Sequence, residues 1–169
     1  MNEKIYLGKG ISYCAICDGA LYKDKEVMIV GNSNETVEEA LYLSEQSSAV
    51  TIVNEEKELD IKEELKQKLK EKTNIYYLNN SKITKLIGED NLKEVEIKNI
   101  AYNETFVKQI DGLFVSIGYE PNSKIYSDIG IKTEDGYILV DKNKKTNLKN
   151  IYAIGDITKK SLYQVVTAT

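Results

Sequence analysis

The sequence predicts an α/β fold built on a doubly wound, Rossmann-like parallel sheet, with a three-stranded β-meander as one crossover. Short apolar runs at 27–30 and 50–53 flank an amphipathic stretch, which indicates strand, helix and strand in succession. Apolar residues alternate with polar ones through 83–110, which is typical of antiparallel strands. The only proline, Pro121, follows another apolar run and indicates a boundary between two lobes.

The composition favours a folded protein in the cytoplasm. Of its 169 residues, 41% are hydrophobic and 30% are charged, a mixture that supports a core. No apolar run approaches the roughly 20 residues that cross a bilayer. The first ten residues carry charge and no apolar segment of the kind found in signal peptides. We therefore expect a cytoplasmic protein with no membrane partner.

The chain has no histidine, tryptophan or arginine, so all 23 basic residues are lysines. Catalysis by an imidazole is excluded within the chain. A net charge of −4 without a basic patch argues against nucleic acid as a partner. No guanidinium group is present to bind a phosphate with two parallel hydrogen bonds.

Two helices and three strands are predicted in the first part of the chain. The run at 27–30 leads into a helix whose apolar face carries Val37, Ala40, Leu41 and Ser44, and 50–53 follows as the second strand. A second helix is expected from 61 to 71, with Asp60 and Glu63 as a capping box and Ile61, Leu65 and Leu69 as its stripe. The third strand is 75–78.

The meander follows, with turns at 88–91 and 101–103. Val95 and Ile97 are expected to face the core, while the charged residues between them face water. The run at 113–118 is another buried strand. Beyond Pro121 we predict a turn near Asp135-Gly136, a strand at 137–140 and an apolar run at 151–156. From the residues alone, these patterns indicate two lobes with a hinge near Pro121.

Cys14-Ala15-Ile16-Cys17 is the sharpest motif. Two cysteines at this spacing indicate a metal site or a redox dithiol. A structural zinc ion needs about four nitrogen or sulfur ligands, which leaves only a site shared between two chains. A redox pair needs the two sulfurs alone, and Asp18 follows them as a group that could exchange a proton. The remaining alternative is that both cysteines are small buried apolar side chains. We expect no metal.

The turn Gly31-Asn32-Ser33-Asn34-Glu35-Thr36 stands where a dinucleotide-binding fold has G-x-G-x-x-G/A. Only the first glycine is present. Ser33 adds a Cβ where the backbone would approach a pyrophosphate, and Thr36 adds a branched side chain where helix and strand would pack closely. An ordinary turn between strand and helix is an equally simple interpretation.

Four segments together resemble the low-molecular-weight thioredoxin reductases. They are Tyr13 to Gly19 around the cysteines, Glu38 to Leu43, Gly112 to Gly118 and Tyr152 to Asp156. The resemblance covers nearly the whole chain, and it extends more distantly to the flavoprotein partner of alkyl hydroperoxide reductase. It implies that 1–118 is a pyridine-nucleotide-type domain bearing the cysteine pair and that 119–169 is an incomplete part of an FAD-binding domain.

In that family, electrons pass from NADPH to FAD, then to the cysteine pair and then to thioredoxin. The resemblance implies that Cys14 exchanges with thioredoxin, that Cys17 faces the flavin and that Asp18 is the acid. We predict an intramolecular disulfide between Cys14 and Cys17 near the start of a helix. The implied FAD contacts are Gly155, Asp156, Ile157, Gln164, Val165 and Thr167.

The electron donor is where this sequence departs from the family. NADPH-dependent relatives follow the second strand with a basic motif, whereas Glu55 and Glu56 stand here. Two lost charge-assisted hydrogen bonds cost about 3–6 kcal/mol, so NADPH is disfavoured and NADH is expected to bind weakly at best, through Glu55. The resulting degenerate nucleotide site comprises Gly31, Ser33, Asn34, Glu35, Thr36, Glu55 and Gly118.

These departures resemble the ferredoxin-dependent flavin thioredoxin reductases of anaerobes. The expected partners are thus thioredoxin or a related disulfide protein, ferredoxin as a donor, and a second copy in a homodimer of the intact protein. The chain is expected to be a fragment that does not turn over alone. The alternatives are an NADH-dependent reductase of a peroxiredoxin system and a non-catalytic nucleotide-binding module with structural cysteines.

Overall fold

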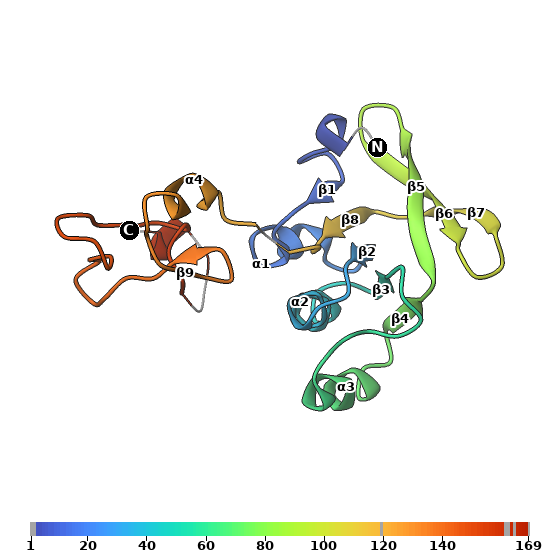
Figure 1. Ribbon diagram of the computed structural model, residues 1–169. Helices are drawn as coiled ribbons and strands as arrows, with labels where there is room; N and C mark the ends of the chain where they lie inside the picture. The colour runs from blue at the N-terminus through green and yellow to red at the C-terminus, as the bar shows by residue number, and fades with distance from the viewer. Residues whose placement is uncertain (1–2, 119, 161–162, 164, 169) are drawn as a thin grey trace. The chain divides into compact units, whose positions relative to one another are not determined.

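A computed structural model describes residues 3–118, 120–160, 163 and 165–168. The chain divides into two compact units, Met1–Gly118 and Tyr119–Thr169. The first unit holds a parallel sheet with a layer on each face. Figure 1 shows the helices α2 (Asn34–Ser44) and α3 (Glu63–Lys70) on one side of it. The strands β5 (Ser81–Gly88), β6 (Leu92–Asn99) and β7 (Glu104–Gln109) lie on the other.

Five parallel strands form the central sheet in the spatial order β1-β8-β2-β3-β4. The strands predicted from apolar runs are present as β2 (Glu26–Val30), β3 (Ala49–Val53), β4 (Ile75–Leu78) and β8 (Gly112–Val115). The edge strand β1 (Ile11–Ser12) was not predicted, because two residues are too few to show a period. The parallel α/β sheet is confirmed.

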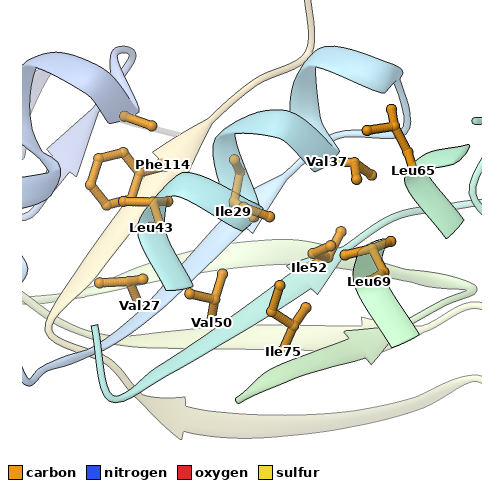
Figure 2. Packing of buried hydrophobic residues seen from close by; sticks show 12 residues of the cluster. Val27, Ile29, Val37, Leu43, Val50, Ile52, Leu65, Leu69, Ile75 and Phe114 are labelled. Atoms are coloured by element: carbon orange, nitrogen blue, oxygen red, sulfur yellow. The ribbon is translucent and has the colours of Figure 1, made fainter. Parts of the chain in front are cut away.

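Helices α2 (Asn34–Ser44) and α3 (Glu63–Lys70) cover one face of the sheet. Figure 2 shows their buried side chains meeting those of the strands, with Val37 and Leu43 from α2 and Leu65 and Leu69 from α3. Val37 and Ala40 are fully buried as predicted, but Leu43 takes the central position in the core while Leu41 is only partly buried.

The start of α3 corrects one prediction. Its N-cap is Lys62, with no side-chain cap, so Asp60 and Glu63 do not form a capping box. The backbone N–H of Asp60 donates to Asn32 Oδ1 (3.0 Å), and that of Lys62 donates to Asn34 Oδ1 (2.9 Å). Because the segment before the helix is bonded to the turn after β2, the helix begins only at Glu63.

The predicted meander is confirmed as the antiparallel sheet β5 (Ser81–Gly88), β6 (Leu92–Asn99) and β7 (Glu104–Gln109). Val95 and Ile97 are fully buried and join Met28 and Leu113 in a second core cluster. Alternate residues of β2 therefore pack into two different cores. Val27 and Ile29 lie in the core under the helices, and Met28 lies in the core under the meander.

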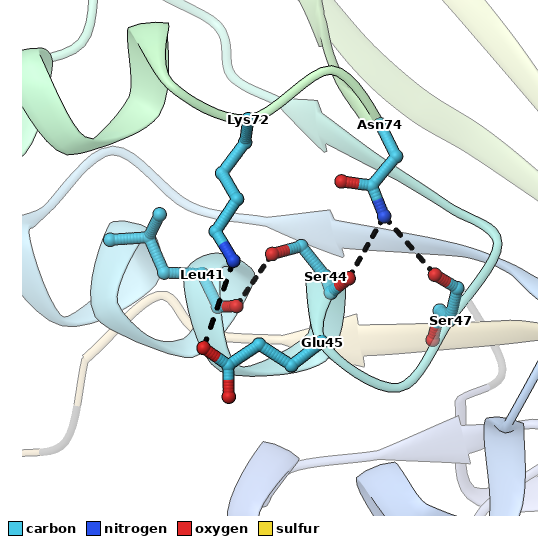
Figure 3. Close-up of polar contacts among 6 residues, drawn as sticks. All are labelled: Leu41, Ser44, Glu45, Ser47, Lys72 and Asn74. Atoms are coloured by element: carbon cyan, nitrogen blue, oxygen red, sulfur yellow. Dashed lines mark hydrogen bonds and ion pairs between the residues drawn. The ribbon is translucent and has the colours of Figure 1, made fainter.

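The C-terminal end of α2 is held by the segment that leads into β4, as Figure 3 shows. Asn74 donates through Nδ2 to the carbonyl oxygens of Ser44 (2.9 Å) and Ser47 (3.2 Å). The amino group of Lys72 lies 3.7 Å from the Glu45 carboxylate. These contacts satisfy carbonyl groups that a helix end leaves without partners.

The second unit contains little regular structure. It holds α4 (Lys124–Ser127), the hairpin β9 (Thr133–Glu134) and β10 (Tyr137–Ile138), and the 3-10 turn η3 (Val165–Thr167). The hairpin turns at Asp135-Gly136 as expected, but the strand predicted at 137–140 ends at Ile138. Among the described residues, no helix has the length and apolar character of a membrane span.

Candidate functional site

Cys14 and Cys17 form a disulfide, with their Cα atoms 5.2 Å apart. Cys14 is half-buried and is the N-cap of the short helix α1 (Ala15–Asp18), where its Sγ accepts a hydrogen bond from the Cys17 backbone N–H (3.1 Å). Cys17 is exposed. The predicted intramolecular disulfide at the start of a helix is thus present. In the described part of the chain, no group of three or more histidine, cysteine, aspartate or glutamate side chains could hold a metal ion.

Ser12, the last residue of β1, connects the two ends of the disulfide loop. Its hydroxyl lies 2.7 Å from Asp18 Oδ2, to which it donates, and 3.3 Å from the Cys14 carbonyl oxygen. The Ser12 hydroxyl oxygen in turn accepts a hydrogen bond from the Cys14 backbone N–H (3.0 Å). Ser12 is 3% exposed, whereas Asp18 is half-buried. Asp18, which sequence reasoning singled out as an acid, is therefore held by a buried hydroxyl.

Two tyrosines border the loop. The Tyr22 ring packs edge-on against Phe114, with centroids 5.2 Å apart. Burial, and secondarily the charges of Asp18 and Asp111, raises the pKa of the Tyr22 phenol. The Tyr13 hydroxyl donates to the Glu3 carboxylate (2.6 Å), next to the 3-10 turn η1 (Glu3–Ile5).

The turn after β2 packs too tightly for any side chain at Gly31. A Cβ there would lie 2.2 Å from the Ser116 carbonyl oxygen and 2.3 Å from Thr36 Oγ1. Thr36 is fully buried, and its hydroxyl donates to that same Ser116 oxygen (2.9 Å). Thr36 therefore joins the start of α2 to the end of β8 by a hydrogen bond, at a position where a glycine or alanine would leave only packing contact.

Ser33 and Thr36 form a capping box at the N-terminus of α2. Ser33 Oγ accepts from the Thr36 backbone N–H (3.2 Å), and Thr36 Oγ1 accepts from the Ser33 backbone N–H (3.3 Å). Backbone N–H groups at a helix start are the donors that bind anions such as pyrophosphate. Here the chain's own side chains already occupy two of them.

The turn is also bonded to the loop after β3, through the contacts of Asn32 and Asn34 with residues 60 and 62. Glu55 and Glu56 lie exposed in that loop, and Glu35 is exposed at the start of α2. Gly118 has a backbone φ of +88° and open space beside its Cα. The structure thus brings the predicted nucleotide residues from Gly31 to Thr36 together, and it bonds the loop that bears Glu55 to that turn.

Glu39, on the next turn of α2, was not predicted as a site residue. Burial raises the pKa of its carboxyl group, and a hydrogen bond with Ser116 opposes this shift in part. Ser116 therefore contacts α2 twice, through its carbonyl oxygen at Thr36 and through its side chain at Glu39.

The second unit carries the expected Gly155-Asp156 pair. Gly155 has a φ of +84°, and a Cβ placed on it would meet, among the described residues, the Ala168 carbonyl oxygen at 3.8 Å. Lys160 bridges two of the predicted FAD residues, since its amino group lies 2.7 Å from Asp156 Oδ1 and donates to the Thr167 carbonyl (2.8 Å). The Ile157 carbonyl accepts from Ile138 N (2.8 Å). Val165 begins η3, and Gln164 lies outside the described residues.

Sequence reasoning missed Ser12 and Lys160. A serine two residues before Cys14 and six before Asp18 carries no periodic or compositional signal, because its role depends on where β1 ends. Lys160 is one of 23 lysines and lies four residues after Asp156, a spacing that suits an ion pair on any helical turn.

Comparison with known proteins identifies relatives along nearly the whole chain. Residues 3–169 match the family described as pyridine nucleotide-disulphide oxidoreductase. The thioredoxin reductase of Bacillus subtilis (strain 168) is 40% identical over 170 residues, which cover 99% of this chain and 54% of that protein. The thioredoxin reductase of Listeria innocua is 35% identical over 169 residues, with 99% and 53% covered. The chain therefore spans about half the length of these relatives.

Solved structures agree. The thioredoxin reductase from Streptococcus pyogenes MGAS5005 superposes with a TM-score of 0.92 at 30% identity, covering 98% of this chain and 55% of that one. A ferredoxin-flavin thioredoxin reductase from Clostridium acetobutylicum gives 0.55 at 31% identity, covering 98% and 52%. The expected closeness to the ferredoxin-dependent branch is therefore not supported by the superposition. The chain belongs to the pyridine nucleotide-disulphide oxidoreductase family, and it is similar to the bacterial, low-molecular-weight thioredoxin reductases within it.

Proposed function

We propose that this chain is the dithiol-bearing part of a flavin-dependent thioredoxin-disulfide reductase, in which Cys14 and Cys17 pass electrons from FAD to thioredoxin. The observation that carries the proposal is the Cys14–Cys17 disulfide on a partly exposed loop, with the Asp18 carboxylate held beside it. The second unit supports the same proposal, because it carries the Gly155-Asp156 pair that the resemblance implies as a flavin contact.

The reduced pair would act by thiol-disulfide exchange. The Cys14 thiolate attacks the disulfide of thioredoxin, and one thioredoxin sulfur leaves and takes up a proton. Cys17 then loses its proton and attacks Cys14 in the mixed disulfide, which releases the second thioredoxin sulfur. Two electrons move to thioredoxin and the Cys14–Cys17 disulfide is restored. Asp18, which follows Cys17 directly, is the group that donates and accepts the protons.

Flavin fits the second unit only in part. The open face of Gly155 admits close approach of a ligand to the backbone, and the carboxylate of Asp156 is an acceptor for hydroxyl groups. Ile157, Gln164, Val165 and Thr167 complete the contacts that we propose. Bound FAD would supply the two electrons that open the disulfide. A ligand of this size needs most of its surface enclosed, so we expect the chain by itself to purify without flavin colour.

The donor is proposed to be something other than NADPH. The capping box uses two backbone donors that a pyrophosphate would need, and Glu55 and Glu56 repel the 2′-phosphate. Ferredoxin is the donor that we propose, with weak NADH binding through Glu55 as the second candidate. The intact protein is proposed to be a cytoplasmic homodimer.

Trapping tests the exchange. The chain is reduced with dithiothreitol, freed of reagent and mixed with oxidised thioredoxin, and the products are separated under denaturing, non-reducing conditions. Cys17→Ser is expected to accumulate a mixed disulfide through Cys14, whereas Cys14→Ser is not. Trapping by Cys14→Ser alone would reverse the two roles, and failure of the unmodified dithiol to reduce thioredoxin would contradict the function.

Calorimetry tests the donor. At low salt we expect no NADPH binding at micromolar concentrations, and any NADH binding should disappear in Glu55→Ala. Exposed Glu58→Ala is the matched control, since it removes the same charge from the same loop. Micromolar affinity for NADPH would show that lysines replace the absent arginines.

A further inference from the structure

The geometry points to Ser12 as a positioning residue for the redox centre, one that holds the Asp18 carboxylate in place to exchange protons with the cysteine pair. This inference rests on the proposed function, because Asp18 needs a fixed position only if it serves the exchange. Ser12 bonds to the backbone of Cys14 and to the carboxylate of Asp18, so it would act through these neighbours.

The Ser12 hydroxyl has a single proton, which it gives to the Asp18 carboxylate. A serine hydroxyl can donate one hydrogen bond and accept up to two. The Asp18 oxygen lies at 2.7 Å and the Cys14 carbonyl at 3.3 Å, so the carboxylate is the stronger acceptor in both distance and charge. The Ser12 hydroxyl oxygen also accepts a hydrogen bond from the Cys14 backbone N–H (3.0 Å). One buried atom thus fixes the residues on both sides of the Cys-x-x-Cys loop.

Ser12 is held by a rigid part of the molecule, the central sheet. Ser12 is 3% exposed, and it ends a strand whose residues pair with β8, Ile11 with Leu113 and Ser12 with Phe114. Phe114 is itself buried in the main core cluster. The hydroxyl is therefore anchored to the central sheet, whereas the Asp18 side chain that it holds is half-exposed and lies at the end of a four-residue helix. A short helix of this kind has little stability of its own.

A third contact ties Asp18 to the disulfide itself. The Asp18 backbone N–H donates to the Cys14 carbonyl oxygen (3.1 Å), the atom that also faces the Ser12 hydroxyl. Asp18 is thus held at two points, since its backbone bonds to Cys14 and its carboxylate bonds to Ser12. Loss of the Ser12 hydroxyl would release the carboxylate while leaving the backbone contact in place.

The test uses reduction of the disulfide by dithiothreitol, which needs neither flavin nor thioredoxin. A thiolate of the reagent attacks one protein sulfur, and the other protein sulfur leaves and takes up a proton. The second thiol of the reagent then loses its proton and attacks the reagent sulfur of the mixed disulfide, which releases the remaining protein sulfur to take up a proton. The protein gains two electrons and two protons, and the reagent becomes a cyclic disulfide. Rates are followed by acid quenching, alkylation and mass measurement for the unmodified chain, Ser12→Ala, Asp18→Asn and the double variant, across a range of pH.

We expect Asp18→Asn to slow reduction on the order of tenfold or more, as loss of a proton-transfer group does. Ser12→Ala should slow it over the same range of pH, and it should have no further effect when Asp18 is already Asn. Ser81→Ala, which removes another buried hydroxyl that donates to a carbonyl (Asn79, 2.8 Å), is the control and should leave the rate unchanged.

The outcomes separate the two proposals. Equal slowing by Ser12→Ala in both backgrounds, or at every pH alike, would show a role in loop packing and would overturn the positioning inference alone. So would an effective Asp18→Asn combined with an unaltered Ser12→Ala. An Asp18→Asn variant as fast as the unmodified chain would overturn the role of Asp18 in the proposed function, and the inference about Ser12 with it.

Discussion

Two loops at the carboxyl edge of the same parallel sheet use their hydroxyl groups in opposite ways. After β1, the Ser12 hydroxyl holds a side chain that stays half-exposed next to the disulfide. After β2, the hydroxyls of Ser33 and Thr36 turn inward and cap the helix that follows. Ligands of open α/β sheets gather at this edge. The hydroxyl group after β1 therefore holds a partly exposed carboxylate, whereas the hydroxyl groups after β2 form hydrogen bonds within their own turn.

The difference also bears on the proposed loss of NADPH binding. The turn after β2 retains the glycine at which strand, helix and β8 meet, since a Cβ at Gly31 has no room. The helix start that would face a pyrophosphate is closed by side chains instead. Close packing requires glycine at position 31. Glycines at positions 33 and 36 would be required only for binding a dinucleotide.

Reopening the closed loop is the change with the largest expected effect. Ser33→Gly, Thr36→Ala, Glu55→Arg and Glu56→Arg together should create NADPH affinity, because two charge-assisted hydrogen bonds contribute about 3–6 kcal/mol, or roughly 10²- to 10⁴-fold. Calorimetry measures the gain. As a control of equal charge, the same arginines are placed at the exposed Glu63 and Glu64 of α3. An equal gain there would show attraction by charge alone and would undermine the assignment of this loop.

Filling the space beside Gly31 should have the next largest effect. Gly31→Ala places a Cβ against the Ser116 carbonyl and Thr36 Oγ1, so we expect the free energy of unfolding to fall by roughly 3 kcal/mol in urea titration. Gly19→Ala, in the 3-10 turn η2 (Gly19–Tyr22), is the comparison, since its Cβ would meet the movable side chain of Tyr42 at 3.0 Å. Equal losses at the two sites would mean that the turn after β2 is less tightly closed than described.

The smallest expected effect is on the pH dependence of stability, through Glu39 in the helix that follows the turn after β2. Burial raises the pKa of Glu39 in the folded chain above its ordinary value of 4.5, so the folded state binds this proton more tightly than the unfolded state. The contribution of this carboxyl group is thus most favourable below pH 4.5, and it is lost as the pH rises through the raised pKa. Glu39→Gln should therefore raise the melting temperature at pH 7 and change it little at pH 4.

Circular dichroism at both values of pH provides the measurement. Glu38→Gln, one residue away on the exposed side of α2, is the control and should show no such difference. A Glu39→Gln variant that melts lower at pH 7 would mean that the hydrogen bond with Ser116 outweighs the cost of burying the charge.

The fold could be predicted where neighbouring residues determine it. The apolar runs of β2, β3 and β4 and the alternation around Val95 and Ile97 are local signals, and each is confirmed. The start of α3 could not be predicted, because Asn32 and Asn34 hold the preceding backbone from about 28 residues away. The strand β1 depends on β8, which is distant in sequence, and so leaves no local pattern.

The candidate site divides in the same way. The cysteine spacing made the disulfide predictable. Ser33 was expected only to place a Cβ near a pyrophosphate, although serine is a favoured N-cap residue and caps α2 here. That Thr36 would complete a capping box could not be foreseen, because the usual residue at this position is glutamate or glutamine. The hydroxyl of Ser12 meets Asp18 only because β1 stops where it does, a fact of the tertiary structure.

The pairing of β1 with β8 also bears on the order in which the molecule forms. Ile11 lies beside Leu113, so the cysteines leave the ribosome about 100 residues before the strand that supports their loop. The strands and helices between them, from β2 to β4, make contacts nearer in sequence and can assemble earlier. At a synthesis rate of about 5–20 residues per second, several seconds would pass between the synthesis of the two cysteines and that of β8. During this time β1, which leads into the cysteine loop, would have no partner strand β8. The loop that bears the cysteines can therefore reach its native support only after β8 has been synthesised.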